Sequence, residues 1–141
     1  MNRPDREHLL LITLTCVGLG DSAYLTIDSF AKVPPVCPTI GILDCGRVTQ
    51  SQYSHPLGVP VALLGLLWFA VMLGLALLQP DFASYLMLPL WIAGVAMIGY
   101  LVFVELALLH AICIYCTLAH ACTVLTIVPI LRISFSEAED G

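Results

Sequence analysis

The chain has 141 residues, of which 60% are hydrophobic and 11% are charged, and its formal net charge is −5 at pH 7. Soluble domains carry about 25% charged residues, so this composition excludes an ordinary soluble domain, and the negative charge argues against nucleic acid as a partner. A helix needs roughly 20 apolar residues to cross a lipid bilayer. Four windows meet that length: residues 9–27, 57–78, 85–109 and 111–131. The sequence therefore predicts one membrane domain over residues 1–141.

The first window could belong to a signal peptide, because Arg3 and Arg6 precede it. However, the apolar run is long, contains Asp21 and is followed by no convincing small-residue cleavage site. We therefore expect a retained membrane helix.

Basic residues near helix ends indicate the orientation of a membrane protein. Three arginines flank the first and last windows on one side (Arg3, Arg6 and Arg132), against two basic residues in the loop of residues 29–56. We therefore expect a multi-pass plasma-membrane protein with both termini in the cytoplasm. The loop and the connection between the third and fourth windows would then lie outside.

The six cysteines divide by position. Cys37 and Cys45 lie in the loop, and Cys113 and Cys116 lie where the fourth window begins. On a helix, positions i and i+3 share a face, and a helix N-terminus favours a thiolate. Two pairs on one side of the membrane predict a relay by thiol–disulfide exchange, on the side where disulfides persist. The other two, Cys16 and Cys122, are interpreted as core residues.

Other uses of the four paired cysteines stay open. Cys37 and Cys45 could form a static loop disulfide, and Cys113 and Cys116 could be small apolar residues of the core. Four thiolates also suit zinc, but the Cys-X7-Cys spacing of the loop pair is poor for a zinc knuckle. We therefore predict no metal site.

Two ionisable residues, Asp21 and Glu105, fall inside the windows, where charge is costly and often functional. We expect Asp21 to have a structural role at a helix end, and Glu105 to reach the membrane interface. His110 is expected to face solvent in the turn before Cys113. The glycines of the second and third windows, Gly65 and Gly94 among them, are expected to allow close helix packing.

Several of these residues occur together in one known arrangement. Gly20-Asp21-Ser22-Ala23-Tyr24-Leu25 ends the first window, Ser51 follows Cys45 by six positions, and Gly58-Val59-Pro60 enters the second window. With the Cys37/Cys45 and Cys113-Ile114-Tyr115-Cys116 spacings, nearly the whole chain resembles the vitamin K epoxide reductase family in its small prokaryotic form.

The resemblance implies an all-α integral membrane fold, in which an exterior loop and short helix cap a quinone pocket inside a four-transmembrane-helix bundle. The quinone would be of the ubiquinone, menaquinone or vitamin K type. Cys113 and Cys116 would form the active disulfide, with Cys116 facing the quinone ring. Cys113 would exchange with Cys45, and Cys37 would take electrons from a partner thiol. Ser51 would hydrogen-bond the quinone, and His120, which shares a helix face with Cys116, could also donate to it.

The implied function is a membrane thiol-disulfide oxidoreductase that oxidises a partner dithiol, reduces a membrane quinone and supports disulfide formation outside the cytoplasm. Many prokaryotic members carry a fused thioredoxin-like domain, which this sequence lacks, so we expect a thioredoxin-like partner in trans. The animal enzymes use an asparagine near the start of the second helix, where this chain is apolar around Val61. Because this asparagine is absent, a true vitamin K epoxide reductase is the alternative and quinone reduction is the main expectation. A proton-coupled four-helix transporter using Glu105 or Asp21, or a structural subunit with a static disulfide, would be the alternatives from other classes.

Overall fold

The computed structural model describes residues 3–79 and 81–140. These residues form helices and short connections, and no strand beyond isolated bridges occurs among them. The elements are α1 (Arg3–Ala31), α2 (Cys45–Thr49), the 3-10 turns η1 (Gln52–Ser54) and η2 (Pro56–Gly58), α3 (Val61–Leu78), α4 (Ala83–Phe103), the π-helix η3 (Val104–Leu109), α5 (Ile114–Leu125) and α6 (Ile127–Asp140).

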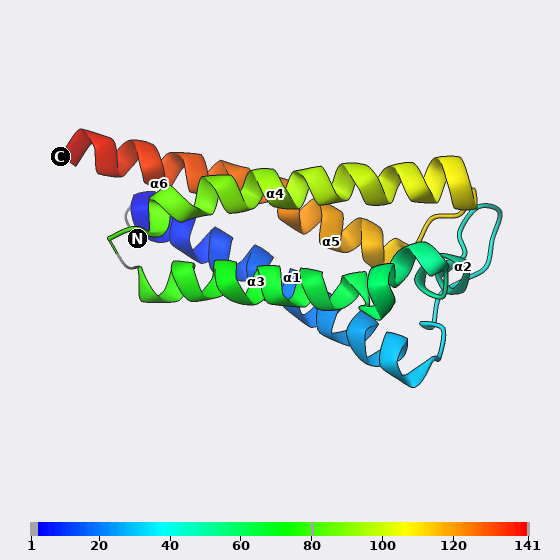
Figure 1. The fold of residues 1–141 in the computed structure, drawn as a ribbon. Coiled ribbons are helices and arrows are strands. Elements are labelled where there is room, and N and C mark those ends of the chain that lie inside the picture. Colours follow the sequence, from blue (N-terminus) through cyan, green and yellow to red (C-terminus); the bar gives the residue numbers. More distant parts are fainter. Residues whose placement is uncertain (1–2, 80, 141) are drawn as a thin grey trace.

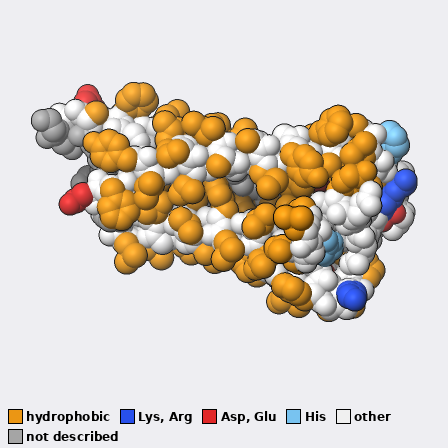
Figure 2. All heavy atoms as spheres, in the orientation of Figure 1, with side chains coloured by type: hydrophobic (Ala, Val, Ile, Leu, Met, Phe, Trp, Pro, Cys, Tyr) orange, Lys and Arg blue, Asp and Glu red, His pale blue; other side chains and the backbone are white. Residues whose placement is uncertain are grey.

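Four helical segments of the described chain are long and apolar enough to cross a membrane: Asp5–Ala31, Val61–Leu78, Ala83–Leu109 and Ile114–Ser136. A helix satisfies its own backbone groups, which a bilayer core cannot do. Hydrophobic side chains cover the length of the bundle in Figure 2. The predicted all-α four-transmembrane-helix fold is therefore confirmed.

The four spans run up and down, so the connections gather at two ends (Figure 1). The segment between α1 and α3 lies at the same end as the connection between α4 and α5. We call this the loop end. The α3–α4 connection, the start of α1 and the end of α6 lie at the opposite end. This arrangement brings the loop of residues 29–56 next to the start of α5.

Two spans begin later than the hydrophobic windows suggested. Leu57 and Gly58 have φ angles of 57° and 81°, so the chain turns there and α3 begins only at Val61. The fourth span begins at Ile114 and consists of α5 and most of α6, with a break at Thr126. Pro129 explains the break, because it has no N–H to donate to the carbonyl of Leu125, the last residue of α5.

Helix α1 packs against α3, α5 and α6. Close approach depends on small residues: Gly65 lies against Ser22 of α1, and Gly94 lies against Trp68. The main buried cluster lies toward the end opposite the loop and contains Leu11, Met72, Leu75, Ala76, Ala83, Met87, Ile130 and Ile133. A second, smaller cluster at the loop end contains cysteines.

Candidate functional site

The loop pair of cysteines is joined by a disulfide between Cys37 and Cys45, whose Cα atoms are 6.1 Å apart. Cys45 is the first residue of α2, and the side chain of Asp44 caps this helix by accepting a hydrogen bond of 2.9 Å from the N–H of Arg47. The cap fixes the direction of α2 and buries Cys45, while Cys37 stays half-buried. The loop therefore holds the pair at the rim of the bundle.

The second pair lies at the start of α5. Cys113 is the N-cap residue, and its sulfur accepts a 3.5 Å hydrogen bond from the N–H of Cys116. Both cysteines are free in this structure, and the active Cys113–Cys116 disulfide implied by the resemblance stays a prediction. A hydrogen bond with the Cys116 side chain holds the pKa of the Cys113 thiol below its ordinary value, against the effect of burial. Cys113 is therefore disposed to act as a thiolate.

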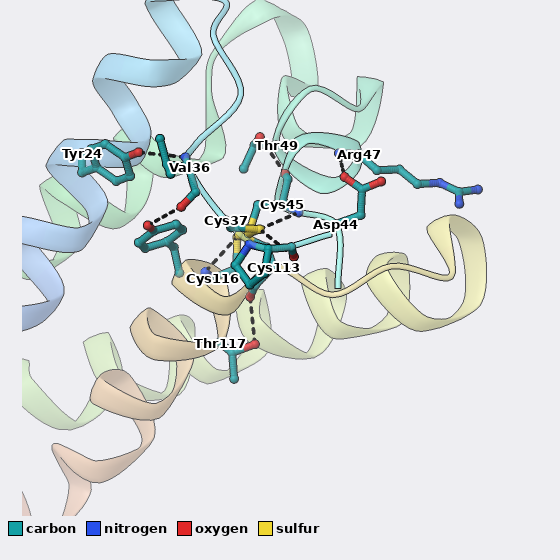
Figure 3. Close-up of a disulfide and its surroundings, with 12 residues drawn as sticks. Tyr24, Val36, Cys37, Asp44, Cys45, Arg47, Thr49, Cys113, Cys116 and Thr117 are labelled. Carbon is teal, nitrogen blue, oxygen red and sulfur yellow. Dashed lines mark hydrogen bonds between the residues drawn. A yellow bond between two sulfur atoms is a disulfide. The ribbon is translucent and has the colours of Figure 1, made fainter. Parts of the chain in front are cut away.

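The two pairs meet in one buried cluster at the loop end. Cys45, Val48, Ala111 and Cys113 form its core, and Cys37 and Cys116 pack against it. Figure 3 shows the disulfide directly beside the start of α5. Backbone hydrogen bonds fasten the loop there, because Ile112 N–H donates to the carbonyl of Ile42 over 2.8 Å and Asp44 N–H donates to the carbonyl of Ile112 over 3.1 Å.

Two tyrosines fix the residue before Cys37. The hydroxyl of Tyr115 donates to the carbonyl of Val36 over 2.7 Å, and the N–H of Val36 donates to the hydroxyl of Tyr24 over 3.1 Å. Figure 3 shows Tyr24 reaching Val36 from α1. Because Tyr115 lies between the two cysteines of the α5 pair, the Cys113-Ile114-Tyr115-Cys116 motif itself holds the loop.

A cavity of about 260 Å³ lies between the four spans, below the cysteine cluster. Its walls are mostly apolar, with Trp68 and Phe69 of α3 among them, and α2 and η1 contribute residues at the loop end. The ionisable groups on the wall are Tyr53, Glu105, Cys116 and His120. The site thus combines an apolar chamber with one sulfur and a few groups able to exchange protons.

The structure places most of the predicted site residues in this region. Cys116 and His120 line the cavity, and Cys37, Cys45 and Cys113 lie in the adjoining cluster. Ser51 is not on the cavity wall: its hydroxyl is 3.1 Å from that of Ser54, which lines the cavity. Ser51 therefore lies one hydrogen bond behind the wall.

The expected position of Glu105 at the membrane interface is wrong. Its side chain is only 5% exposed and lines the cavity, and the residue lies in the first turn of the π-helix η3. His110 is exposed as expected, and its Nδ1 lies 2.9 Å from the carbonyl oxygen of Leu106. The contact of Tyr115 with the loop was not predicted from the sequence, although the position of Tyr115 inside the cysteine motif could have indicated it.

A model of the vitamin K epoxide reductase family matches residues 9–131, which span all the elements of this site. The matched segment includes both cysteine pairs, all of the second and third spans and most of the first and fourth. The chain therefore belongs to the vitamin K epoxide reductase family and is a multi-pass membrane oxidoreductase.

Proposed function

We propose that this protein oxidises the dithiol of a thioredoxin-like partner and passes the electrons to a membrane quinone. The observation that carries the proposal is the meeting of both cysteine pairs in one buried cluster, with Cys116 also on the cavity wall. This is the arrangement that an electron relay from the loop to the membrane interior requires.

The residues of the cavity fit a quinone. Apolar walls with the rings of Trp68 and Phe69 suit a flat apolar ring, and a carbonyl oxygen needs hydrogen-bond donors at its edge. Thr49 and Thr123 already donate to backbone carbonyls, whereas His120 and Tyr53 are wall groups that can donate to that oxygen. When bound, a quinone supplies an acceptor for two electrons and two protons.

The residues of this chain divide the relay into exchanges. A partner dithiol reduces the Cys37–Cys45 disulfide and becomes a disulfide itself. The Cys45 thiolate then attacks the sulfur of Cys113 in an oxidised Cys113–Cys116 pair, and Cys37 resolves the mixed disulfide by attacking Cys45. The result is an oxidised loop pair and a reduced α5 pair, which is the state in this structure. Oxidation of that reduced pair releases two electrons and two protons toward the cavity.

We place the loop end outside the plasma membrane and both termini in the cytoplasm. Arg6 and Arg132 lie toward the end opposite the loop, and basic residues favour the cytoplasmic side. A loop disulfide also persists best in an oxidising compartment. The thioredoxin-like partner would then be an extracytoplasmic protein acting in trans on Cys37.

Quinone is favoured over an epoxide as the substrate. Val61, near the start of α3, lines the cavity and offers no hydrogen-bond donor from its side chain. Opening of an epoxide needs a proton donor close to its oxygen. Turnover of a quinone and of its epoxide by the same preparation would separate the two activities.

The test is a trap for the mixed disulfide. In a Cys37→Ser variant, Cys45 has no resolving partner, so a Cys45–Cys113 disulfide should accumulate after oxidation with a short-chain quinone. Mass-spectrometric mapping of disulfides detects it. Cys16→Ser is the control, because Cys16 is exposed on α1 and belongs to neither pair. Absence of the Cys45–Cys113 link in the oxidised variant would show that the relay is wrong.

A further inference from the structure

Glu105 is a buried carboxylate with no opposite charge beside it. It is the second residue of the π-helix η3, and its side chain is 5% exposed. No Lys or Arg of the described residues forms an ion pair with it. Its backbone carbonyl accepts hydrogen bonds from the N–H groups of His110 and Ala111, which fixes the residue in place. A buried carboxyl in a membrane span is costly, so its retention needs a reason.

The π-helix supplies the geometry. A π-helical turn is rare and is frequently found at functional sites. Here the turn lies between α4 and the connection to Cys113, and it places the carboxyl of Glu105 on the cavity wall with Cys116 and His120.

Glu105 also acts on the reacting pair. Its carboxyl interacts with the backbone of Cys113 and acts electrostatically on the thiols of both Cys113 and Cys116. The carboxyl therefore lies on the wall of the chamber in which protons are consumed and also acts on the sulfur that must lose a proton.

We propose that Glu105 is the proton-transfer residue of the α5 cysteine pair. It donates its carboxyl proton to an oxygen of the molecule bound in the cavity and takes up the proton that Cys113 releases. This inference rests on the proposed function. Two S–H bonds break, one S–S bond forms, and the acceptor gains two electrons and two protons. Glu105 gives one proton and regains one from Cys113, so it returns to its starting state, and the second proton comes from the thiol of Cys116 on the cavity wall.

The other titratable groups around the site fit this role less well. Asp21 of α1 interacts with Cys116, but it does not line the cavity and does not act on Cys113. Tyr53 of η1 and His120 of α5 line the cavity but are not among the groups that act on the Cys113 thiol. Helix α3 contributes no titratable side chain to the wall.

The first test compares Glu105→Gln with Asp21→Asn in quinone-free protein. The ultraviolet absorbance of the thiolate is followed against pH, and Cys113→Ser in each background identifies the Cys113 contribution. The negative charge of Glu105 raises the pKa of Cys113, so its removal should shift the Cys113 midpoint to lower pH. Asp21→Asn should leave that midpoint unchanged. An unchanged midpoint in Glu105→Gln would overturn the proposal.

The second test measures quinone reduction with a dithiol donor. General acid–base groups typically contribute about 100-fold or more, so Glu105→Gln should lose at least that factor while the Cys37–Cys45 disulfide still forms. If the wild-type protein reduces quinone and Glu105→Gln keeps the full rate, this inference fails and the proposed function stands. If the wild-type protein reduces no quinone, the proposed function itself fails.

A third measurement tests proton transfer by Glu105 even if the Glu105→Gln variant does not fold. In the Asp21→Asn variant, the infrared band of a protonated carboxyl should change when the Cys113–Cys116 pair is oxidised, because Glu105 exchanges its proton with that pair. A carboxyl band that is insensitive to the redox state of the pair would contradict the proposal.

Discussion

Tyr24 and Tyr115 bind the same backbone residue from opposite sides, and their ring centroids lie 5.2 Å apart. Tyr24 accepts from the N–H of Val36, and Tyr115 donates to its carbonyl. Val36 precedes Cys37, and Tyr115 precedes Cys116. The two tyrosines therefore set how the loop disulfide is presented to the α5 pair.

Replacing Tyr115 by Phe should remove its hydrogen bond to Val36 while the aromatic ring still fills the same space. The variant loses one hydrogen bond, which costs about 0.5–1.5 kcal/mol, and Cys37 becomes less well positioned. We expect slower exchange between the two cysteine pairs, measured by quenching with acid and mapping disulfides over time. Tyr100→Phe is the control, since Tyr100 lies on α4 with 44% of its surface exposed. Equal exchange rates in both variants would contradict the role given to Tyr115.

The ionisation of Cys113 should depend on Cys116. The hydrogen bond from Cys116 lowers the pKa of Cys113, so the thiolate forms at lower pH than in an isolated cysteine. Exchange through Cys113 should rise with pH up to this lowered pKa and level off above it. In Cys116→Ala the midpoint should move to higher pH, as thiolate absorbance would show. The pKa of Cys113 is lower in the folded protein than in the unfolded chain, so ionised Cys113 stabilises the fold at pH values above the unfolded pKa. This stabilisation is lost as the pH falls through the folded pKa.

The spans and the cysteine pairs could be predicted from local sequence. Apolar length indicates a membrane helix, and the spacing of Cys113 and Cys116 is fixed within a single helical turn. The inward position of Glu105 could not be predicted, because a π-helical turn leaves no periodic signal in so apolar a segment. The contact of Tyr115 with Val36 joins residues 79 positions apart, so it depends on how the loop folds back onto α5. The position of Ser51 behind Ser54 likewise depends on the irregular turns after α2.

The ion pair at the end opposite the loop should contribute to stability. Arg132 Nη1 lies 2.7 Å from Oε1 of Glu7, whose side chain is 9% exposed. Arg132→Met would leave this buried carboxylate without its partner, which should cost roughly 1–3 kcal/mol. Glu7→Gln should cost less, because the amide oxygen still accepts from Arg132 and no charge is buried. Thermal unfolding in detergent of both single variants and the double variant measures the coupling energy between Glu7 and Arg132. Additive losses would show that the pair is not coupled.

Two glycines of α1 offer a matched test of helix packing. A Cβ at Gly18 would overlap the ring of Phe69 on α3, whereas a Cβ at Gly20 would meet nothing within 4 Å. Gly18→Ala should therefore destabilise the bundle by about 1–3 kcal/mol through overpacking. Gly20→Ala should be neutral or stabilise by up to about 1 kcal/mol, because alanine is the better helix former.

Phe69 links this packing to the site, since its ring also lines the cavity. Displacing the ring in Gly18→Ala should narrow the cavity and weaken binding of a short-chain quinone, while Gly20→Ala should bind it as the wild-type protein does. Unfolding temperature and quinone binding, measured on the same two preparations, separate the two effects. If the two substitutions change stability and binding equally, α1 and α3 do not approach each other as closely at Gly18 as the structure indicates.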